Sequence, residues 1–305
     1  MDYRIGILTS LYDDYAVELL QKIDQAIEEG FIPAKIPFIF CSRGKGMSAE
    51  VDGRIAAIEQ LKNVEDLLIY PAKEFQPELR RQDRESWRLA YDRKVMKLLP
   101  NVDSYLNVGY MQIIGPEMLA KFDIVNLHPA LPWLGPTGMW PRVMEEQAER
   151  PLPYLMSIEG DRLSNIISDV MNISWNKAGG MLHLVTNETD RGPVISWYEF
   201  PLLSRTLNKL YCDITVFLRG QSLDDLKKTG LWKELVQKIR QEQSKGELPL
   251  ILLTYRKLAR HEWIIKGKQL LINNQVFPGG YCLNYEIAKF LQDQGEKLPG
   301  VKLTP

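Results

Sequence analysis

Two segments of the sequence join apolar strand residues to polar side chains that can perform acid–base chemistry. Residues 123–132 contain Asn126 and His128, and residues 183–192 contain Asp190. Each segment begins with apolar residues and ends with turn-forming ones, a pattern typical of a buried strand that delivers side chains to a sheet edge. Taken singly, each polar residue is also an ordinary turn former. Their joint occurrence in this order favours an active site.

Asn126 and His128 lie two positions apart, so on a strand both side chains point to the same face. A carboxylate within hydrogen-bond reach of an imidazole favours the charged ring, which stabilises an oxyanion or transfers a proton. The amide N–H of an asparagine is a neutral donor for the same oxygen. With Asp190 as the carboxylate, these residue types suit attack of an amine on an acyl carbon through a tetrahedral intermediate. Neither a metal nor a covalent enzyme intermediate is required.

The elements that must position these side chains alternate between strand and helix. Apolar runs predict strands at residues 4–8, 36–41, 67–70, 104–110 and 124–128. Helices are expected between them, including one at about residues 83–99 with Trp87, Tyr91, Val95 and Leu98 on its inner side. This alternation predicts an α/β fold with a doubly wound, mostly parallel sheet. In such sheets ligands bind outside the carboxyl ends of the strands, where the polar residues fall.

We expect residues 1–305 to form a single domain with its core in residues 1–202. Pro151 and Pro153 interrupt the pattern, and an apolar stripe from Leu163 to Met171 predicts a helical insertion at about residues 149–178. This insertion is either a packing or dimer element or a lid over the site. Residues 203–305 are expected to add helices to the core, together with a hairpin around the Lys266-Gly-Lys sequence.

Composition narrows the class of protein. The 305 residues carry a formal net charge of -1, which argues against a dominant nucleic-acid contact. No apolar run is long enough to cross a membrane, and the first residues lack the features of a signal peptide, so a cytoplasmic location is expected. The three cysteines, Cys41, Cys212 and Cys282, show no metal-ligand spacing, and no metal is expected.

At the two polar segments the chain resembles the formyltransferase family, in particular its phosphoribosylglycinamide formyltransferase branch. The family's Asn-x-His-Pro-Ser-Leu-Leu-Pro motif stands here as Asn126-Leu-His-Pro-Ala-Leu-Pro132, with Ala130 in place of Ser and one Leu missing. Its second motif, a His strand followed by a loop ending in Asp-x-Gly-Pro, matches residues 183–193. Residues 108–114 are similar to its folate-binding segment, and residues 276–281 to its closing hairpin. Together the matches span most of the chain.

The resemblance implies a Rossmann-type sheet and one-carbon metabolism, with 10-formyltetrahydrofolate as co-substrate and formyl donor. Asn126 and His128 would polarise the formyl oxygen, and Asp190 would orient His128 and relay a proton. His183 is expected to be structural or to support these residues. The reduced folate would lie between two segments, whose residues are Tyr110, Met111, Gln112, Ile113 and Ile114 in the first and Thr186, Asn187 and Glu188 in the second.

The acceptor is expected to be a small-molecule amine. In the ribotide-binding branch, a Gly-rich loop after the first strand holds a phosphate. Here residues 8–14 contain no Gly and two acids, Asp13 and Asp14, which would repel a phosphate, so an acceptor other than glycinamide ribotide is predicted. Candidate acceptor contacts are Thr9, Ser10, Tyr12 and Trp140. The oligomeric state is left open, and a homodimer is compatible with the sequence.

Three alternatives remain at this point. The same groups could hydrolyse the formyl donor, although the sequence shows no N-terminal regulatory domain of the kind seen in that hydrolase family. The chain could also be a non-catalytic relative that binds folate or another small molecule. A nucleotide-binding doubly wound protein is the third alternative, and the missing Gly-rich loop disfavours it.

Overall fold

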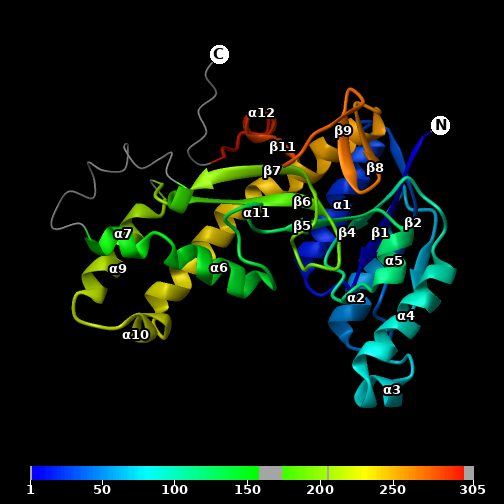
Figure 1. Ribbon diagram of the computed structural model, residues 1–305, viewed down its shortest axis with the longest axis horizontal. Coiled ribbons are helices and arrows are strands. Elements are labelled where there is room, and N and C mark those ends of the chain that lie inside the picture. The colour runs from blue at the N-terminus through cyan, green and yellow to red at the C-terminus, as the bar shows by residue number, and fades with distance from the viewer. Residues whose placement is uncertain (1, 158–173, 205, 299–305) are drawn as a thin grey trace. The chain divides into compact units, whose positions relative to one another are not determined.

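Strands and helices alternate along the chain in the computed structural model, which describes residues 2–157, 174–204 and 206–298. Eight strands are hydrogen-bonded in the order β11-β7-β6-β5-β4-β1-β2-β3, and three form a smaller antiparallel sheet in the order β10-β9-β8 (Figure 1). The strands are β1 (Tyr3–Thr9), β2 (Ala34–Cys41), β3 (Leu67–Ile69), β4 (Ser104–Asn107), β5 (Ile124–His128), β6 (Lys177–Leu184), β7 (Val194–Pro201), β8 (Trp263–Lys266), β9 (Gln269–Ile272), β10 (Gln275–Val276) and β11 (Tyr281–Cys282). The predicted α/β fold with a mostly parallel sheet is confirmed.

Helices flank the strands in sequence. They are α1 (Asp14–Glu28), α2 (Ala49–Ile58), α3 (Pro77–Gln82), α4 (Arg84–Leu98), α5 (Pro116–Lys121), α6 (Trp140–Glu149), α7 (Leu152–Ser157), α9 (Asn208–Leu218), α10 (Leu223–Lys227), α11 (Gly230–Ala259) and α12 (Asn284–Asp293), with a short 3₁₀ turn at Ser174–Asn176. Among residues 2–157, 174–204 and 206–298, no helix has both the length and the apolar character needed to cross a lipid bilayer.

The chain divides into two compact units that interleave in sequence. Unit 1 consists of Met1–Leu127, Leu182–Ile195 and Ile251–Gly280. Unit 2 consists of His128–Met181, Ser196–Leu250 and Tyr281–Pro305. Each unit therefore takes its residues from three separate stretches, and organisation as one domain stays a prediction.

In unit 1, β1 lies between β2 and β4 and pairs with both in parallel. Its residues Ile5, Ile7 and Leu8 are fully buried, as expected for a strand covered on both faces. Aromatic and aliphatic side chains from β2, β4, α4 and α5 form a core cluster with Leu8. The sheet and its helices thus share one continuous apolar interior.

Helix α4 shows how well periodicity predicts this packing. Trp87, Tyr91 and Val95 are buried in the core cluster as predicted, and the Trp87 and Tyr91 rings stack. The prediction for Leu98 is wrong, because this side chain is 39% exposed and Leu99 is buried instead. The helix ends at Leu98, so the chain turns and the next residue points inward.

Three further expectations concern the ends of strands and the turns that follow them. The hairpin of β8 and β9 is confirmed, with Gly267 and Lys268 both at positive φ as a tight two-residue turn requires. The fourth strand is shorter than predicted, since it ends at Asn107 and Gly109 adopts a φ of +67°. The expected hairpin at residues 276–281 does not form. Strand β10 instead pairs antiparallel with β9.

In unit 2, β11 pairs in parallel with β7. Tyr281, the last residue of that predicted hairpin, therefore pairs with β7 and not with β10. Helix α7 contacts both α6 and α9, and α9 also contacts α10 (Figure 1). Helix α6 ends just before Pro151, as the prolines predict. The apolar stripe from Leu163 to Met171 lies outside the described residues, so the predicted helical insertion is described only at its two ends.

Candidate active site

The strand order of unit 1 reverses between β1 and β4. Strands β2 and β3 follow on one side of β1, and β4 and β5 follow on the other. The loops after β1 and β4 therefore start side by side at the carboxyl ends of their strands, where α/β sheets bind ligands. A hydrogen bond of 2.9 Å from the Met111 N–H to the Ser10 Oγ joins the two loops. Unit 1 thus brings the predicted acceptor and folate segments together.

The hydroxyl groups of the first loop are used internally. Thr9 is buried and its Oγ1 accepts the N–H of Leu11 at 3.0 Å, which supports the left-handed φ of +44° at Leu11. Ser10 is also buried and its Oγ lies 2.7 Å from the Oγ of Ser42. Of the predicted acceptor residues in this loop, Tyr12 is the one with an exposed side chain, at 48%. The guanidinium of Arg43 lies over its ring.

The two acids of this loop have defined structural roles. The Asp13 carboxylate accepts the N–H of Ala16 at 3.0 Å and caps helix α1. Arg54 donates to the Asp14 carboxylate at 2.7 Å and to the carbonyl of Tyr12 at 2.8 Å. The N-terminus of α1, which could otherwise attract an anion, therefore already faces a carboxylate of the chain itself.

The predicted folate segment has a buried frame and an exposed apolar face. Tyr110 and Ile114 belong to the core cluster, while Met111 and Ile113 are 41% and 67% exposed, and Gln112 is half-buried. Such exposed apolar side chains on a fixed loop can contact a flat ring.

Each end of this segment is fixed by a side-chain oxygen that accepts a backbone N–H, an amide oxygen at one end and a carboxylate oxygen at the other. The Asn107 Oδ1 accepts the N–H of Tyr110 at 2.7 Å. At the other end, the Asp92 Oδ2 accepts the N–H of Gly115 at 2.5 Å. Burial raises the pKa of the Asp92 carboxyl to about 6. The sequence shows no local signal for Asp92, which comes from helix α4.

Asn126 and Asp190 both approach His183. The Asn126 Nδ2 lies 3.2 Å from the His183 Nε2, and the Asp190 Oδ1 lies 3.7 Å from the same nitrogen. The His183 Nδ1 lies 3.0 Å from the carbonyl oxygen of Leu184, so Nδ1 carries the proton in the neutral ring. Nε2 then accepts the Asn126 amide N–H, which sets the orientation of that amide.

The loop that carries Asp190 turns sharply. Asp190 adopts a φ of +54°, and the Thr186 hydroxyl donates to the Glu188 carbonyl at 3.2 Å. The side chains of Asn187 and Glu188 are exposed, and Thr186 is half-buried. A Cβ at Gly192 would lie 1.7 Å from the Leu184 carbonyl oxygen, so only glycine fits there. The glycine that stands two positions after the aspartate in the motif is therefore required on steric grounds.

In unit 2, His128 is held by the loop that follows it. Its Nε2 lies 2.9 Å from the Pro136 carbonyl oxygen, so Nε2 carries the proton and Nδ1 is the basic nitrogen of the neutral ring. The loop closes tightly at Gly135, where a Cβ would lie 2.2 Å from the Ala130 Cβ. Arg150 donates to the carbonyl of Leu134 at 3.0 Å, and burial lowers the pKa of its guanidinium. The sequence motif does not reveal this supporting arginine.

Large apolar side chains of unit 2 follow this loop. Trp140 is 43% exposed, and Trp133 and Met139 are each 55% exposed. The Trp133 ring meets the Trp197 ring edge-on, with centroids 4.6 Å apart. Of the predicted acceptor contacts, Trp140 belongs to this apolar surface rather than to unit 1.

No group of three or more His, Cys, Asp or Glu side chains in the described part of the chain is arranged to bind a metal ion. The three cysteines are present as free thiols, with Cys41 buried and Cys282 exposed.

Comparisons with known proteins identify the fold. No protein-family model and no curated protein matches the sequence. Among solved structures, the phosphoribosylglycinamide formyltransferase of Coxiella burnetii matches with a TM-score of 0.56 and 15% identity, over 92% of this chain and 99% of that chain. The glycinamide ribonucleotide transformylase 1 of Symbiobacterium toebii matches with a TM-score of 0.52 and 22% identity, over 89% and 94%. The protein has the formyltransferase fold.

A formyltransferase fold confirms the family resemblance at the level of architecture. Identities of 15% and 22% leave the reaction and the substrates to be argued from the side chains. The residues that carry the two motifs are at the end of β5, on β6 and in the loop after β6.

Proposed function

We propose that this protein is a folate-dependent formyltransferase that moves a formyl group from 10-formyltetrahydrofolate to an amine. The observation that carries the proposal is the set formed by Asn126, His183 and Asp190, in which a buried imidazole meets an amide and a carboxylate. In a formyltransferase fold, this set coincides with both predicted sequence motifs. Formyl transfer accounts for the amide donor and the carboxylate together.

The proposed roles follow from the hydrogen-bonding capacity of each group. An asparagine amide has two N–H groups, so Asn126 can donate one to His183 and the other to an oxygen at the acyl carbon. His128, two residues further along β5, exchanges a proton at Nδ1 because its Nε2 is engaged by Pro136. Asp190 accepts a proton from the attacking amine, directly or through water, as the new C–N bond forms. His128 delivers a proton through Nδ1 to the folate nitrogen as its bond to the formyl carbon breaks, and both side chains then recover their starting state by proton exchange with solvent.

The residues present fit a reduced folate. The exposed Met111 and Ile113 offer apolar contact to a flat ring, and the fixed backbone between Asn107 and Gly115 offers hydrogen-bonding groups for its edge. When bound, the folate supplies an activated formyl group. Thr186, Asn187 and Glu188 would form the opposite side of the same site.

The acceptor is proposed to be an amine without a phosphate group at the loop after β1. Asp13 already caps helix α1, so a phosphate placed there would face a carboxylate instead of the free N–H groups of a helix N-terminus. Asp14 contributes less to this repulsion than the sequence suggests, because Arg54 pairs with it. Tyr12 and Trp140 remain the candidate acceptor contacts with exposed side chains.

Binding and turnover test the proposal separately. A saturating reduced folate should raise the melting temperature, since a ligand that binds the folded state stabilises it. The Asp190→Asn variant should lose roughly 10³-fold in formyl transfer, while its folate affinity changes little, because Asp190 acts on the proton rather than on the ring. The Asp213→Asn variant, which changes an exposed carboxylate on α9, is the matched control and should retain full activity.

A screen of small amines, with consumption of the formyl donor as the readout, identifies the acceptor. Consumption without any amine would assign hydrolysis of the donor in place of transfer. Absence of a folate-induced thermal shift at saturating ligand would remove the proposal.

A further inference from the structure

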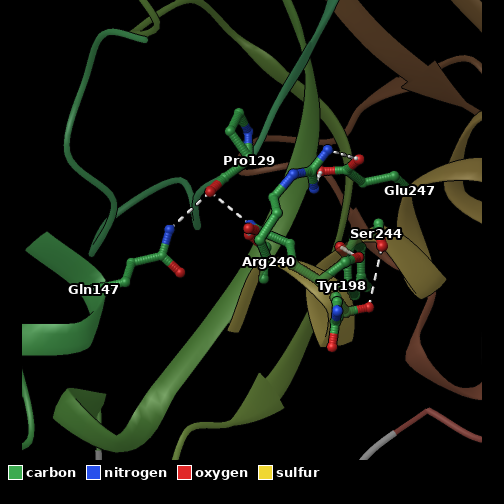
Figure 2. Close-up of polar contacts among 9 residues, drawn as sticks. Pro129, Gln147, Tyr198, Arg240, Ser244 and Glu247 are labelled. Carbon is green, nitrogen blue, oxygen red and sulfur yellow. Dashed lines mark hydrogen bonds and ion pairs between the residues drawn. The ribbon is translucent and has the colours of Figure 1, made fainter. Parts of the chain in front are cut away.

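In unit 2, the carbonyl group of Pro129, the residue that follows His128, is held by two buried side chains. The carbonyl oxygen of Pro129 accepts the side-chain N–H of Gln147 at 2.7 Å and that of Gln243 at 2.6 Å (Figure 2). Gln147 is on α6 and Gln243 is on α11, 114 residues after the proline. Both glutamines are fully buried, at 1% and 0% exposure. Two distant helices thus hold one carbonyl of the His128-Pro129 sequence.

The amide orientations are determined by this geometry. A carbonyl oxygen has two lone pairs, and both are occupied by N–H donors here. Flipping either amide would put its Oε1 against the Pro129 oxygen, so Nε2 must face Pro129 in both side chains. Gln243 also donates its second N–H to the carbonyl of Gly179. The Oε1 atoms of the two glutamines are buried and have no hydrogen-bond partner among the described residues.

This double donation restricts the backbone next to His128. The proline ring fixes φ of Pro129, and it also restricts His128 to extended conformations. The angle that remains is ψ of Pro129, and the direction of the Pro129 carbonyl reports this angle. Because two N–H groups hold that carbonyl, they also hold the start of the loop that returns to His128 at Pro136.

We propose that Gln243 and Gln147 are positioning residues that keep the His128 imidazole in one orientation and one tautomer by holding the Pro129 carbonyl. This inference rests on the proposed function, in which His128 exchanges a proton. The two glutamines contact neither substrate nor the reacting atoms. They act through the backbone between His128 and Pro136.

Tyr198 provides a matched control. Its buried hydroxyl donates to the main-chain carbonyl of Gln243 (Figure 2), so the Tyr198→Phe variant removes a buried hydrogen bond next to Gln243 without touching the glutamine side chain. Ser244 follows on the same helix, and its hydroxyl donates to the carbonyl of Gln241. The Ser244→Ala variant is the surface control.

The test uses the full chain with ¹⁵N-labelled histidine rings. The protein has three histidines, so His128 is assigned by replacing His128 and His261 in turn. In the parent protein, the ring nitrogens of His128 should show a single Nε2–H tautomer. The Gln243→Met and Gln147→Met variants keep side-chain volume but cannot donate, and each should give an averaged tautomer pattern for His128. The two controls should keep the parent pattern, although Tyr198→Phe should lower the melting temperature.

Kinetics add a second readout. Each methionine variant should lower kcat for formyl transfer roughly 10-fold with KM for the folate changed by less than about twofold, since orientation of His128 affects the reaction more than binding. An unchanged His128 tautomer in a folded methionine variant would overturn the inference. Gln147→Met decides the matter if Gln243→Met does not fold. Because the ring signals need no turnover, an inactive parent protein would count against the proposed function alone.

Discussion

At the scale of single residues, His183 has a more specific role than its motif suggests. It is buried, and its Nε2 is approached by both the amide of Asn126 and the carboxylate of Asp190. Its Nδ1–H donates to the Leu184 carbonyl, which leaves Nε2 to accept from Asn126. The imidazole therefore sets which way the Asn126 amide faces.

This arrangement predicts the effect of removing the acceptor nitrogen. In the His183→Phe variant a ring of similar size fills the site, but the Asn126 amide loses its partner and can rotate. We expect kcat for formyl transfer to fall roughly 10-fold, with folate affinity nearly unchanged. A 10-fold loss corresponds to about 1.4 kcal/mol, which is the typical contribution of one hydrogen bond. Steady-state kinetics and a folate titration check this. A variant with parent kcat would show that His183 serves packing alone.

At the scale of elements, the loop after β5 depends on a close approach of its backbone. Gly135 lies where a Cβ would meet the Ala130 Cβ at 2.2 Å and the Leu131 carbonyl oxygen at 2.6 Å. The Gly135→Ala variant should lose about 2 kcal/mol of unfolding free energy, because the loop must open to admit the methyl group.

Urea unfolding measures this loss, and Gly53→Ala is the control. Gly53 lies within α2, and a Cβ there would meet no atom within 4 Å. The control should gain about 0.5–1 kcal/mol from the better helix propensity of alanine. A Gly135→Ala variant as stable as the parent would show that the loop adapts without cost.

The contact between α4 and the start of α5 should make stability depend on pH. Burial raises the pKa of Asp92 to about 6 from its ordinary value of 3.8, so the folded protein binds this proton more tightly than the unfolded chain does. The resulting stabilisation is complete below about pH 4 and is lost as the pH rises through 6. The Asp92→Asn variant has no such titration, and its Oδ1 can still accept the Gly115 N–H.

As the pH rises from 4 to 7, we therefore expect the unfolding free energy of Asp92→Asn to increase relative to that of the parent by at most about 3 kcal/mol, and the difference to be constant above pH 7. Urea unfolding at several pH values gives the two curves. Parallel curves would mean that folding does not raise the pKa of Asp92.

At the scale of the whole molecule, the units are built from interleaved segments. Unit 1 needs residues 182–195 and 251–280 in addition to its first 127 residues. From the last of these stretches, Ile251, Tyr255 and Leu258 are buried at 0%, 1% and 1% exposure. A chain cut after Leu127 lacks these side chains and leaves the apolar surface that they cover exposed to water.

A fragment of residues 1–127 should therefore fail to fold cooperatively. Its circular dichroism should show a broad urea transition, and it should bind a hydrophobic dye, while the full chain unfolds sharply. A sharp transition in the fragment would show that the first 127 residues form an autonomous unit.

Much of the architecture could be predicted from local patterns. The strand at Ile124–His128 has the predicted bounds, and the hairpin turn at Gly267 and Lys268 follows from its residues. Predictions from local patterns were wrong where a contact with a residue far away in the sequence, or the end of a helix, determines the structure. Residues 276–281 pair with two different strands instead of with each other, and Leu98 is exposed at a helix end.

The sequence by itself determined the α/β class and placed Asn126 and His128 on one strand end, because strand periodicity and turn chemistry act between near neighbours. Only the tertiary structure showed that Asn126 and Asp190 both approach the Nε2 of His183, and that Gln147 and Gln243 meet at Pro129. These contacts join residues on different strands and helices, up to 114 positions apart in the sequence, so they depend on how those elements pack. The periodicity of apolar residues reflects only near neighbours in the sequence and does not predict that packing.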